Sequence, residues 1–176
     1  MNTLFNEMVL KATGATALKQ TEVIQELWSG YGEIARYALS DSEQHSIVIK
    51  HICLPEHTSH PRGWNTDTSH ERKVKSYKVE SNWYQYWSKR CNQEAYLPQC
   101  LAVATEGSES LIVLEDLSNA GFTERRSTAN LEEIKSCIAW LAHFHASYLG
   151  EAPTHLWNSG TYWHLETRPD ELDALD

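Results

Sequence analysis

Two charged side chains, Lys50 and Glu80, stand where the sequence pattern predicts apolar faces. The β-branched run from His45 to Ile52 is typical of a strand, and its period of two places Lys50 on the same side as Val48. Aromatic residues three and four positions apart surround Glu80, which predicts a helix with this carboxylate inside an aromatic stripe. Because a charge on a buried face needs a partner, we expect the two to pair, and a paired ammonium group can be held against a phosphate.

A strand lysine paired with a helix glutamate is the phosphate-positioning device of kinase-type phosphoryl transfer. In that chemistry the ammonium group contacts the nucleotide phosphates and the carboxylate holds it in place. The alternative for Lys50 and Glu80 is a lysine whose stem covers apolar surface beside a glutamate at the solvent edge, since both residue types are rarely fully buried. The pattern of this pair alone leaves both interpretations open.

Composition and charge narrow the classes of partner. The chain has 176 residues, 41% hydrophobic and 22% charged, which is ordinary for one or two soluble globular units. A net charge of -9 argues against nucleic acid or an anionic membrane as the main partner, although a local nucleotide pocket can still be basic. No apolar run approaches the roughly 18 residues of a spanning helix, and the N-terminus lacks the order of a secretory signal, so we expect a cytoplasmic protein.

The four cysteines and nine histidines do not point to a metal. The cysteines show no Cys-x-x-Cys spacing, which argues against a zinc ribbon or a thioredoxin-type motif, and we expect reduced, buried thiols. The close histidine pairs, at 57 and 60 and at 143 and 145, match no recognised ligand spacing. We therefore favour a structural or surface role for them.

The elements that must position Lys50 and Glu80 follow from the pattern of apolar and turn residues. Residues 1–20 are either a short helix or an arm, and 54–70 form a polar loop in which Trp64 should anchor against an apolar surface. Gly30-Tyr31-Gly32 predicts a tight turn between two strands. Five strands and one main helix are expected, in chain order, over 23–29, 33–39, 45–52, 69–90 (the helix), 101–105 and 110–115.

After Glu115 the composition becomes polar and turn-rich, which suits a linker between two lobes. Residues 131–149 then predict a helix with one apolar stripe, ended by Gly150 and Pro153. The following tail is rich in aromatic residues, and 168–171 is typical of a helix start.

The order of these elements resembles the small lobe of the protein-kinase-like fold. The order is a strand, Gly-x-Gly, a strand, a strand with the lysine, a helix with the glutamate, two strands and an acidic hinge. More closely, it resembles the aminoglycoside phosphotransferase and choline-kinase-like superfamily, in the branch of the ecdysteroid-kinase-like proteins and their bacterial relatives. The order and spacing of the matching segments, over nearly the whole chain, are specific. The segments are Leu27-Trp28-Ser29-Gly30-Tyr31-Gly32, Ile49-Lys50, Ser76-Tyr77-Lys78-Val79-Glu80 with Trp83-Tyr84, Leu114-Glu115-Asp116-Leu117 with Gly121-Phe122, Trp140-Leu141-Ala142-His143-Phe144-His145-Ala146, and 160–171.

The resemblance implies an α+β fold and an ATP-dependent phosphotransferase that acts on a small-molecule hydroxyl. A nucleotide-binding small lobe over 1–115, with a five-stranded antiparallel sheet and one main helix, would be joined by a hinge over 116–128 to an incomplete helical large lobe over 129–176. The implied nucleotide contacts are Gly30, Tyr31 and Gly32 over the phosphates, Lys50 on the phosphates and held by Glu80, and backbone groups near Glu115 and Leu117 for adenine.

Simpler interpretations of the same residues remain open from the sequence. The two glycines could form only a hairpin turn. Glu115 and Asp116 could be solvated carboxylates at a strand end.

Kinases of this type orient the acceptor hydroxyl with an aspartate in a His-x-Asp-x-x-x-x-Asn loop, and that asparagine and a later aspartate hold metal. Neither motif occurs in these residues, and the spaced carboxylates at 170, 173 and 176 are typical of a solvated face. We therefore expect ATP binding at most and no turnover by these residues alone, with Mg²⁺ only in a complete family member. The chain is then either a fragment of a longer kinase or a natural remnant, whose exposed lobe interface would favour self-association or another protein partner.

A second class of function is a non-catalytic binding or regulatory module that keeps the fold and holds a ligand or a protein with Trp157, Tyr162 and Trp163. A carbohydrate-type binder, suggested by seven tryptophans, is disfavoured. Four of these tryptophans stand where core or lobe-packing residues are expected, at 28, 83, 87 and 140. The acceptor molecule cannot be named from the sequence.

Overall fold

The computed structural model describes residues 2–54, 67–160 and 163–173. Its main elements are α1 (Thr3–Thr13), β1 (Ala17–Glu26), β2 (Gly32–Ser40), β3 (Ser46–Cys53), α2 (Asp67–Asn82), β4 (Cys100–Glu106), β5 (Glu109–Glu115), α3 (Leu131–Ser147) and α4 (Pro169–Asp173). Single helical turns cover Trp28–Gly30, Trp83–Trp87, Ser88–Arg90, Gln93–Ala95 and Leu165–Thr167. Within the described ranges, no helix has the length and apolar character needed to cross a bilayer.

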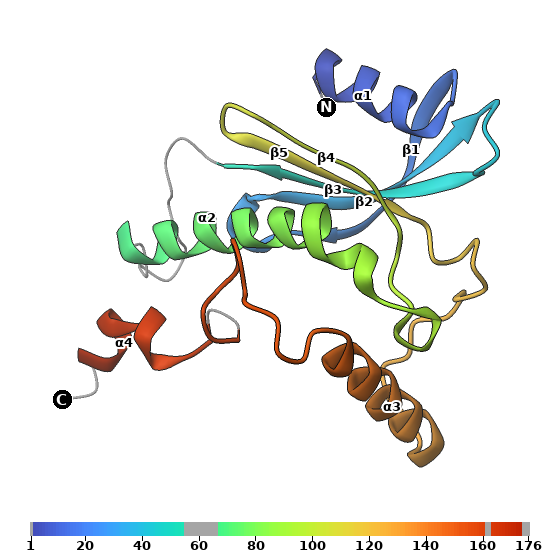
Figure 1. Cartoon of the computed structure of the whole chain (residues 1–176). Helices are drawn as coiled ribbons and strands as arrows, with labels where there is room; N and C mark the ends of the chain where they lie inside the picture. The colour runs from blue at the N-terminus through green and yellow to red at the C-terminus, as the bar shows by residue number, and fades with distance from the viewer. Residues whose placement is uncertain (1, 55–66, 161–162, 174–176) are drawn as a thin grey trace.

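The five strands form one antiparallel sheet in the order β1-β2-β3-β5-β4. Helix α1 lies against one face of this sheet and α2 runs along the other (Figure 1). The chain is therefore α+β, as predicted, with the five-stranded sheet and main helix of a kinase-like small lobe. Residues 1–20, which the sequence left undecided between helix and arm, contain α1, which is capped by Asn2 and ended by Gly14 in a left-handed conformation.

The face of the sheet under α1 is closed by apolar side chains. Phe5 and Val9 of α1 are fully buried against alternate residues of three strands, and their neighbours are aliphatic or aromatic. The buried members of this cluster are Phe5, Val9, Ala35, Tyr37, Ile47, Ile49, Leu111 and Val113.

The opposite face, under α2, is smaller and more polar. Its buried cluster is Leu27, Tyr31, Ile52, Tyr77 and Ile112. Lys50 stands on this face because it lies directly across from Ile34 on β2 and Ile112 on β5, and directly paired residues share a face. This mixed face is where the candidate site is built.

Two element boundaries differ from the prediction. The first strand covers Ala17–Glu26 instead of 23–29. It is an edge strand with two register shifts and mostly exposed side chains, so it lacks the alternation by which strands are recognised. The helix predicted over 69–90 begins at Asp67 and stays helical to Arg90, as an α-helix to Asn82, a π-helical turn over Trp83–Trp87 and a 3₁₀ turn over Ser88–Arg90. The predicted loop anchor Trp64 lies outside the described residues.

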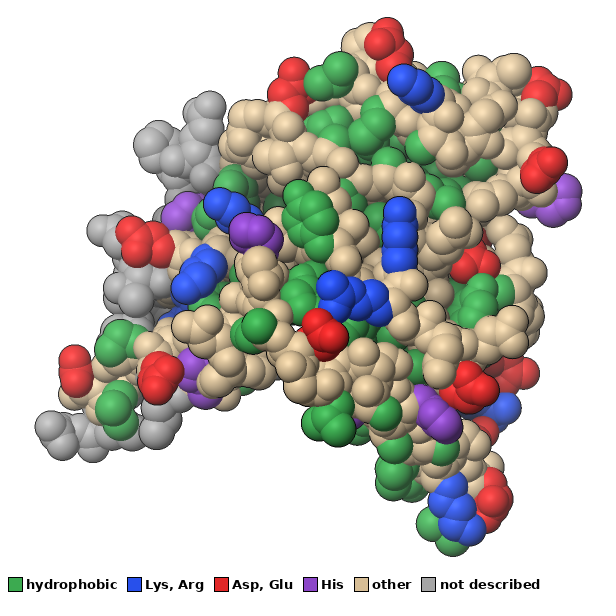
Figure 2. Space-filling model, in the orientation of Figure 1, with side chains coloured by type: hydrophobic (Ala, Val, Ile, Leu, Met, Phe, Trp, Pro, Cys, Tyr) green, Lys and Arg blue, Asp and Glu red, His purple; other side chains and the backbone are tan. Residues whose placement is uncertain are grey.

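Helix α3 forms as predicted, with a capping box between Asn130 and Glu133 at its start. Its apolar stripe is exposed, however, and none of its residues is buried. Hydrophobic side chains accordingly lie on the surface in the region of α3 (Figure 2). It contacts the preceding chain through Trp140, whose Nε1 donates to the Tyr96 carbonyl over 2.9 Å, and through Phe144, whose ring centroid is 6.1 Å from that of Trp83.

Two further predictions are wrong. Trp28, expected to pack in a core or lobe contact, is 64% exposed and begins the 3₁₀ turn over Trp28–Gly30. The four cysteines are free, as expected, but they are not all buried, since Cys53 and Cys137 are exposed.

Candidate functional site

Lys50 and Glu80 form a two-pronged ion pair on the α2 face of the sheet. The Lys50 Nζ lies 2.6 Å from Glu80 Oε2 and 2.7 Å from Oε1. The Lys50 side chain is 14% exposed and that of Glu80 is 33% exposed. The pairing expected from the pattern therefore exists, and a lysine merely extending to the surface does not describe it. Strand β3 fixes the lysine stem, and α2 brings the carboxylate to it.

The ring of Tyr77 lies beside this pair and is contacted by two ammonium groups. Lys50 Nζ is 5.2 Å from the ring centroid, and Lys73 Nζ is 5.1 Å from it. Burial lowers the pKa of Lys73, and the positive charge of Lys50 lowers it further, against a smaller opposing effect of Glu80. The sequence analysis missed Lys73, although its spacing of four and seven residues from Tyr77 and Glu80 places all three on one helix face.

The two glycines near residue 31 have different roles in the backbone. Both have positive φ, at 72° for Gly30 and 122° for Gly32. A Cβ on Gly30 would meet nothing within 4 Å, whereas a Cβ on Gly32 would lie 2.0 Å from the carbonyl oxygen of His51. Gly32 is therefore required for strand packing, and Gly30 stands over open space.

Tyr31, between these glycines, points inward and is 4% exposed. Its hydroxyl group is 2.7 Å from His70 Nδ1, and its ring packs on that of Tyr77 with centroids 5.9 Å apart. Its backbone carbonyl accepts from the Cys53 N–H over 2.9 Å. The turn is therefore wider than the tight Gly-x-Gly turn predicted, because a 3₁₀ turn over Trp28–Gly30 precedes it and Tyr31 anchors it to α2.

The backbone amides of this turn make only long hydrogen bonds. The Gly30 N–H donates to the Leu27 carbonyl over 3.3 Å, and the Tyr31 N–H donates to the Trp28 carbonyl over 3.5 Å. Both distances lie beyond the usual 2.7–3.2 Å of such bonds. Both hydrogen bonds are therefore weaker than usual.

At the end of β5, the carboxylate of Glu115 faces the preceding loop. It accepts from the Tyr96 hydroxyl group over 2.8 Å and from the Gln99 N–H over 3.1 Å. The bond to Glu115 raises the pKa of Tyr96, as does its partial burial. The Leu117 carbonyl accepts from two later amides of its own turn, over 3.1 and 3.0 Å. Among the described residues, none accepts a hydrogen bond from the Leu117 N–H.

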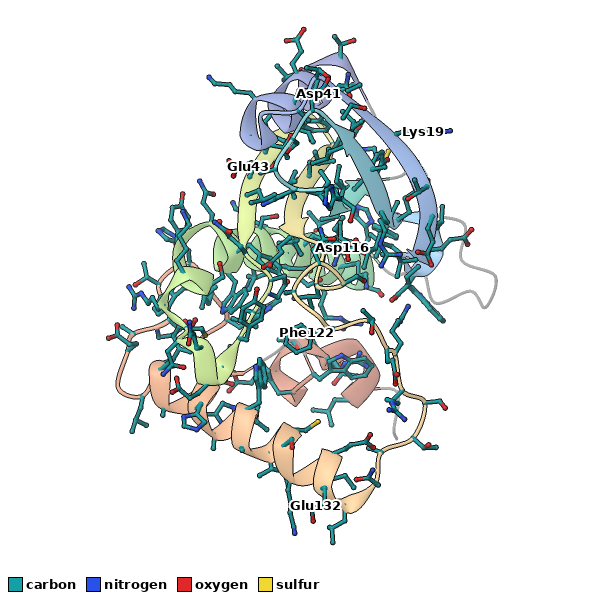
Figure 3. All side chains as sticks on the ribbon, turned by 90° about the vertical axis from the view of Figure 1, so that its right-hand side faces the viewer. Lys19, Asp41, Glu43, Asp116, Phe122 and Glu132 are labelled. Carbon is teal, nitrogen blue, oxygen red and sulfur yellow. The ribbon has the colours of Figure 1, made fainter. Side chains whose placement is uncertain are left out.

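Asp116, between these two residues, is 2% exposed and does not behave as a solvated carboxylate. Its Oδ2 accepts from Arg36 Nε and from Ser46 Oγ, each over 2.7 Å. Burial alone would raise the pKa of Asp116, but these bonds, a third from the Ser118 N–H and the charge on Arg36 together lower it. Figure 3 shows Asp116 and Phe122 between the sheet and α3. The alternative that Asp116 is a solvated carboxylate at a strand end is therefore wrong. Its partner Arg36 was not singled out by the sequence analysis.

Between Lys50 and Leu117, the same face of the sheet carries Arg36 and several aliphatic side chains that are incompletely covered. Val48 pairs directly with Leu114, and Ile34 lies across from Lys50. All three aliphatic side chains are only half-buried. A flat apolar group could therefore lie between the Lys50 ammonium group and the Leu117 amide.

A hollow of about 410 Å³ lies on the other side of α2 and includes Glu80 in its wall. The segment after α3 lines part of it, and the Trp157 ring there is contacted by Lys75 Nζ at 4.4 Å from the ring centroid. The full lining is Ser76, Val79, Glu80, Trp83, Tyr84, Leu156, Trp157 and Gly160. Of the aromatic tail that the sequence analysis singled out, Trp157 lines this hollow, Trp163 is exposed, and Tyr162 lies outside the described residues.

In the part of the chain that the structure describes, no three His, Cys, Asp or Glu side chains come together as a metal site. The histidines at 143 and 145 are exposed on α3.

Comparison with known proteins identifies the family. The model of the ecdysteroid kinase-like family matches residues 35–150. This range contains Lys50, Glu80, Glu115 and Leu117, and it begins just after the turn at residues 30–32. No curated protein matches the chain. Since the matched range covers well over half of the sequence, the chain belongs to the ecdysteroid kinase-like family.

Proposed function

We propose that this chain binds ATP on the α2 face of its sheet, as the nucleotide-binding part of a phosphotransferase for a small-molecule hydroxyl. The family supports a kinase-like phosphotransferase in general. The observation that carries the narrower proposal is the ion pair in which both carboxylate oxygens of Glu80 hold the Lys50 ammonium group. An ammonium group held in this way is a fixed positive charge for a phosphate.

The surroundings of the pair suit the other parts of the nucleotide. The half-buried surface of Val48 and Leu114 would receive the adenine ring, and the Leu117 N–H would donate to its edge. The phosphates would then extend toward Lys50 and beneath the turn at Gly30, whose weakly bonded amides favour an anion. The buried Tyr31 side chain would anchor this turn to α2, and Gly32 would let the turn pack closely against β3.

Transfer of the phosphate needs parts that these residues do not contain. No His-x-Asp-x-x-x-x-Asn motif is present in the sequence. Since phosphoryl transfer depends on positioning of the acceptor and on metal-borne charge, we propose that the described residues bind ATP without turning it over. Mg²⁺ would be held in a complete family member. We also propose that the chain works in the cytoplasm, where ATP is available and thiols stay free.

A second candidate function is a non-catalytic binding module. The hollow between α2 and Leu156–Gly160 favours the binding module. Its aromatic walls, with Glu80 and Ser76 as polar groups, suit a small organic ligand. The two functions differ in what they require of Lys50, since this lysine does not line the hollow.

Calorimetry with ATP and Mg²⁺ tests the proposal on the wild-type chain and on Lys50→Ala. Removal of the fixed charge should weaken ATP binding by about 10-fold to 100-fold, as expected for a charge-assisted hydrogen bond. Lys19→Ala is the matched control, because Lys19 is exposed on β1 (Figure 3) and should not affect binding. A folded wild-type chain that does not bind ATP would contradict the proposal and leave the binding module.

A further inference from the structure

Lys73 is a second cation at the site, and among the described residues it has no carboxylate of its own. Both carboxylate oxygens of Glu80 are engaged by Lys50. No carboxylate among the described residues lies within ion-pair distance of Lys73 Nζ. Its ammonium group instead rests against the Tyr77 ring, on the same ring that Lys50 approaches. The cluster therefore contains two ammonium groups and one carboxylate, with an excess of one positive charge.

The position of Lys73 along the site follows from the direction of α2. The first turn of the helix is fixed to the glycine turn, because His70 bonds to Tyr31. The other end of the helix leads to Tyr84, which packs in the same cluster as Cys100 and Leu114, next to the end of β5. Lys73 precedes Glu80 by seven residues, so it lies farther from Leu117 and closer to the glycine turn than the ion pair does.

The half-buried Lys73 ammonium group, which has no carboxylate within ion-pair distance among the described residues, is in an unfavourable environment for a charge. Burial and the neighbouring Lys50 lower the pKa of Lys73, so both disfavour its charged form. A polyanion placed against both lysines would relieve this repulsion and would replace the lost hydration with charge-assisted hydrogen bonds.

We propose that Lys73 is a second phosphate-binding residue, which contacts the terminal phosphates of a nucleotide while Lys50 contacts those nearer the ribose. The site would thereby select a nucleoside triphosphate over a monophosphate. This inference rests on the proposed function, because it assigns a role within the same nucleotide site. A purely structural role is the competing explanation, in which Lys73 only covers the Tyr77 ring as a cation–π partner.

Calorimetry with ATP and with AMP, on the wild-type chain and on Lys73→Met, separates these roles. The methionine keeps the length and packing of the stem and removes the charge. We expect ATP affinity to fall by about 10-fold to 100-fold and AMP affinity to stay within about threefold. Lys78→Met is the matched control, because Lys78 is exposed on the same helix, and it should leave both affinities unchanged.

Three results would overturn the inference, and they differ in what else they affect. Equal loss of ATP and AMP affinity in Lys73→Met would show a structural role. Unchanged ATP affinity in Lys73→Met, with a wild-type chain that binds ATP, would remove the inference and leave the proposed function intact. A folded wild-type chain that binds neither nucleotide would remove both. Thermal unfolding of each variant establishes that the chain is folded.

Discussion

The two faces of the sheet differ in what their side chains achieve. Under α1, eight buried apolar side chains form a closed core, in which Phe5 and Ile47 have no exposed surface. Under α2, the buried cluster is smaller, two of its five members are tyrosines, and a lysine and an arginine stand on the same sheet face. Burial of apolar surface supplies stability in proportion to the area removed from water, so the α1 face should carry most of it.

This difference shows how a small sheet can support a site that is costly to maintain. Lys50 and Arg36 each need carboxylates from other elements. Lys50 pairs with Glu80 of α2, and Arg36 pairs with Asp116 after β5 and with Glu22 of β1. Such ion pairs give little net stability once desolvation is counted. The closed α1 face can supply that stability, which leaves the α2 face free to remain open and charged.

The largest effect on stability is expected at the closed face. Phe5→Ala should lower the free energy of unfolding by about 3–5 kcal/mol, because it removes a fully buried ring and leaves a cavity. Leu4→Ala, one position earlier on the same helix but half exposed, should cost under about 1 kcal/mol. Urea unfolding followed by circular dichroism measures both. Equal costs for the two variants would show that α1 does not seal a core.

A comparable effect is expected at one of the two glycines on the site face. Gly32→Ala should cost about 3 kcal/mol or more, because a methyl group would clash with the His51 carbonyl at a positive φ. Gly30→Ala should cost about 1–2 kcal/mol, from the left-handed conformation alone. Thermal unfolding of the pair tests whether only Gly32 is a packing residue, which a reversed order would refute.

A smaller, pH-dependent effect is expected for the ion pair of Arg36 and Asp116. Arg36→Met should cost about 2 kcal/mol at pH 7, below the 3–5 kcal/mol of a fully buried pair, since the Arg36 side chain is 31% exposed. The pKa of Asp116 is lowered in the folded state. The stability that the ionised Asp116 contributes is therefore fully present above the unfolded pKa of an aspartate, about 3.9. This stability is lost as the pH falls through the lower pKa of the folded state.

The difference between wild type and Arg36→Met should accordingly shrink as the pH is lowered below about 4. Denaturant unfolding at a series of pH values measures it. Arg126→Met serves as the control, because the Arg126 side chain is 63% exposed and pairs on the surface with Glu124. A difference that stays constant down to low pH would exclude the assigned role of Asp116.

The smallest effect is expected at the anchor of the glycine turn. Tyr31→Phe keeps the buried ring and removes the hydroxyl group that bonds to His70. The cost should be about 1 kcal/mol, the net value of one hydrogen bond. Tyr86→Phe, at a half-exposed tyrosine, should be neutral. If both variants unfold at the wild-type temperature, Tyr31 holds the turn by packing alone.

The sequence predicted those parts of the molecule that depend on local periodicity. The β-branched alternation of β3 and the aromatic spacing of α2 placed Lys50 and Glu80 on facing surfaces, and the pair was inferred before any geometry was known. The predicted position of β1 was shifted because the side chains of this edge strand are mostly exposed. Its sequence therefore shows little alternation of apolar and polar residues. Trp28 was misplaced, since it begins the turn that precedes Tyr31 and its side chain is exposed.

Contacts between distant residues explain what could not be predicted. Arg36 and Asp116 are 80 positions apart, and nothing in either local pattern indicates the other. The unpaired charge of Lys73 is likewise a property of three elements together, since it depends on Lys50 having taken both oxygens of Glu80. The nucleotide contacts themselves, and the division into lobes around 116–128, stay predictions.

The most direct test of the central claim is to follow the backbone amide NMR signals of the chain as ATP and Mg²⁺ are added. We predict the largest shift changes at Gly30, Lys50 and Leu117, on the face under α2, with the amides of α1 unchanged. Changes confined to Leu156–Gly160 would instead place the ligand in the hollow between α2 and this segment. Changes centred on α1, or none in a folded chain, would contradict the account.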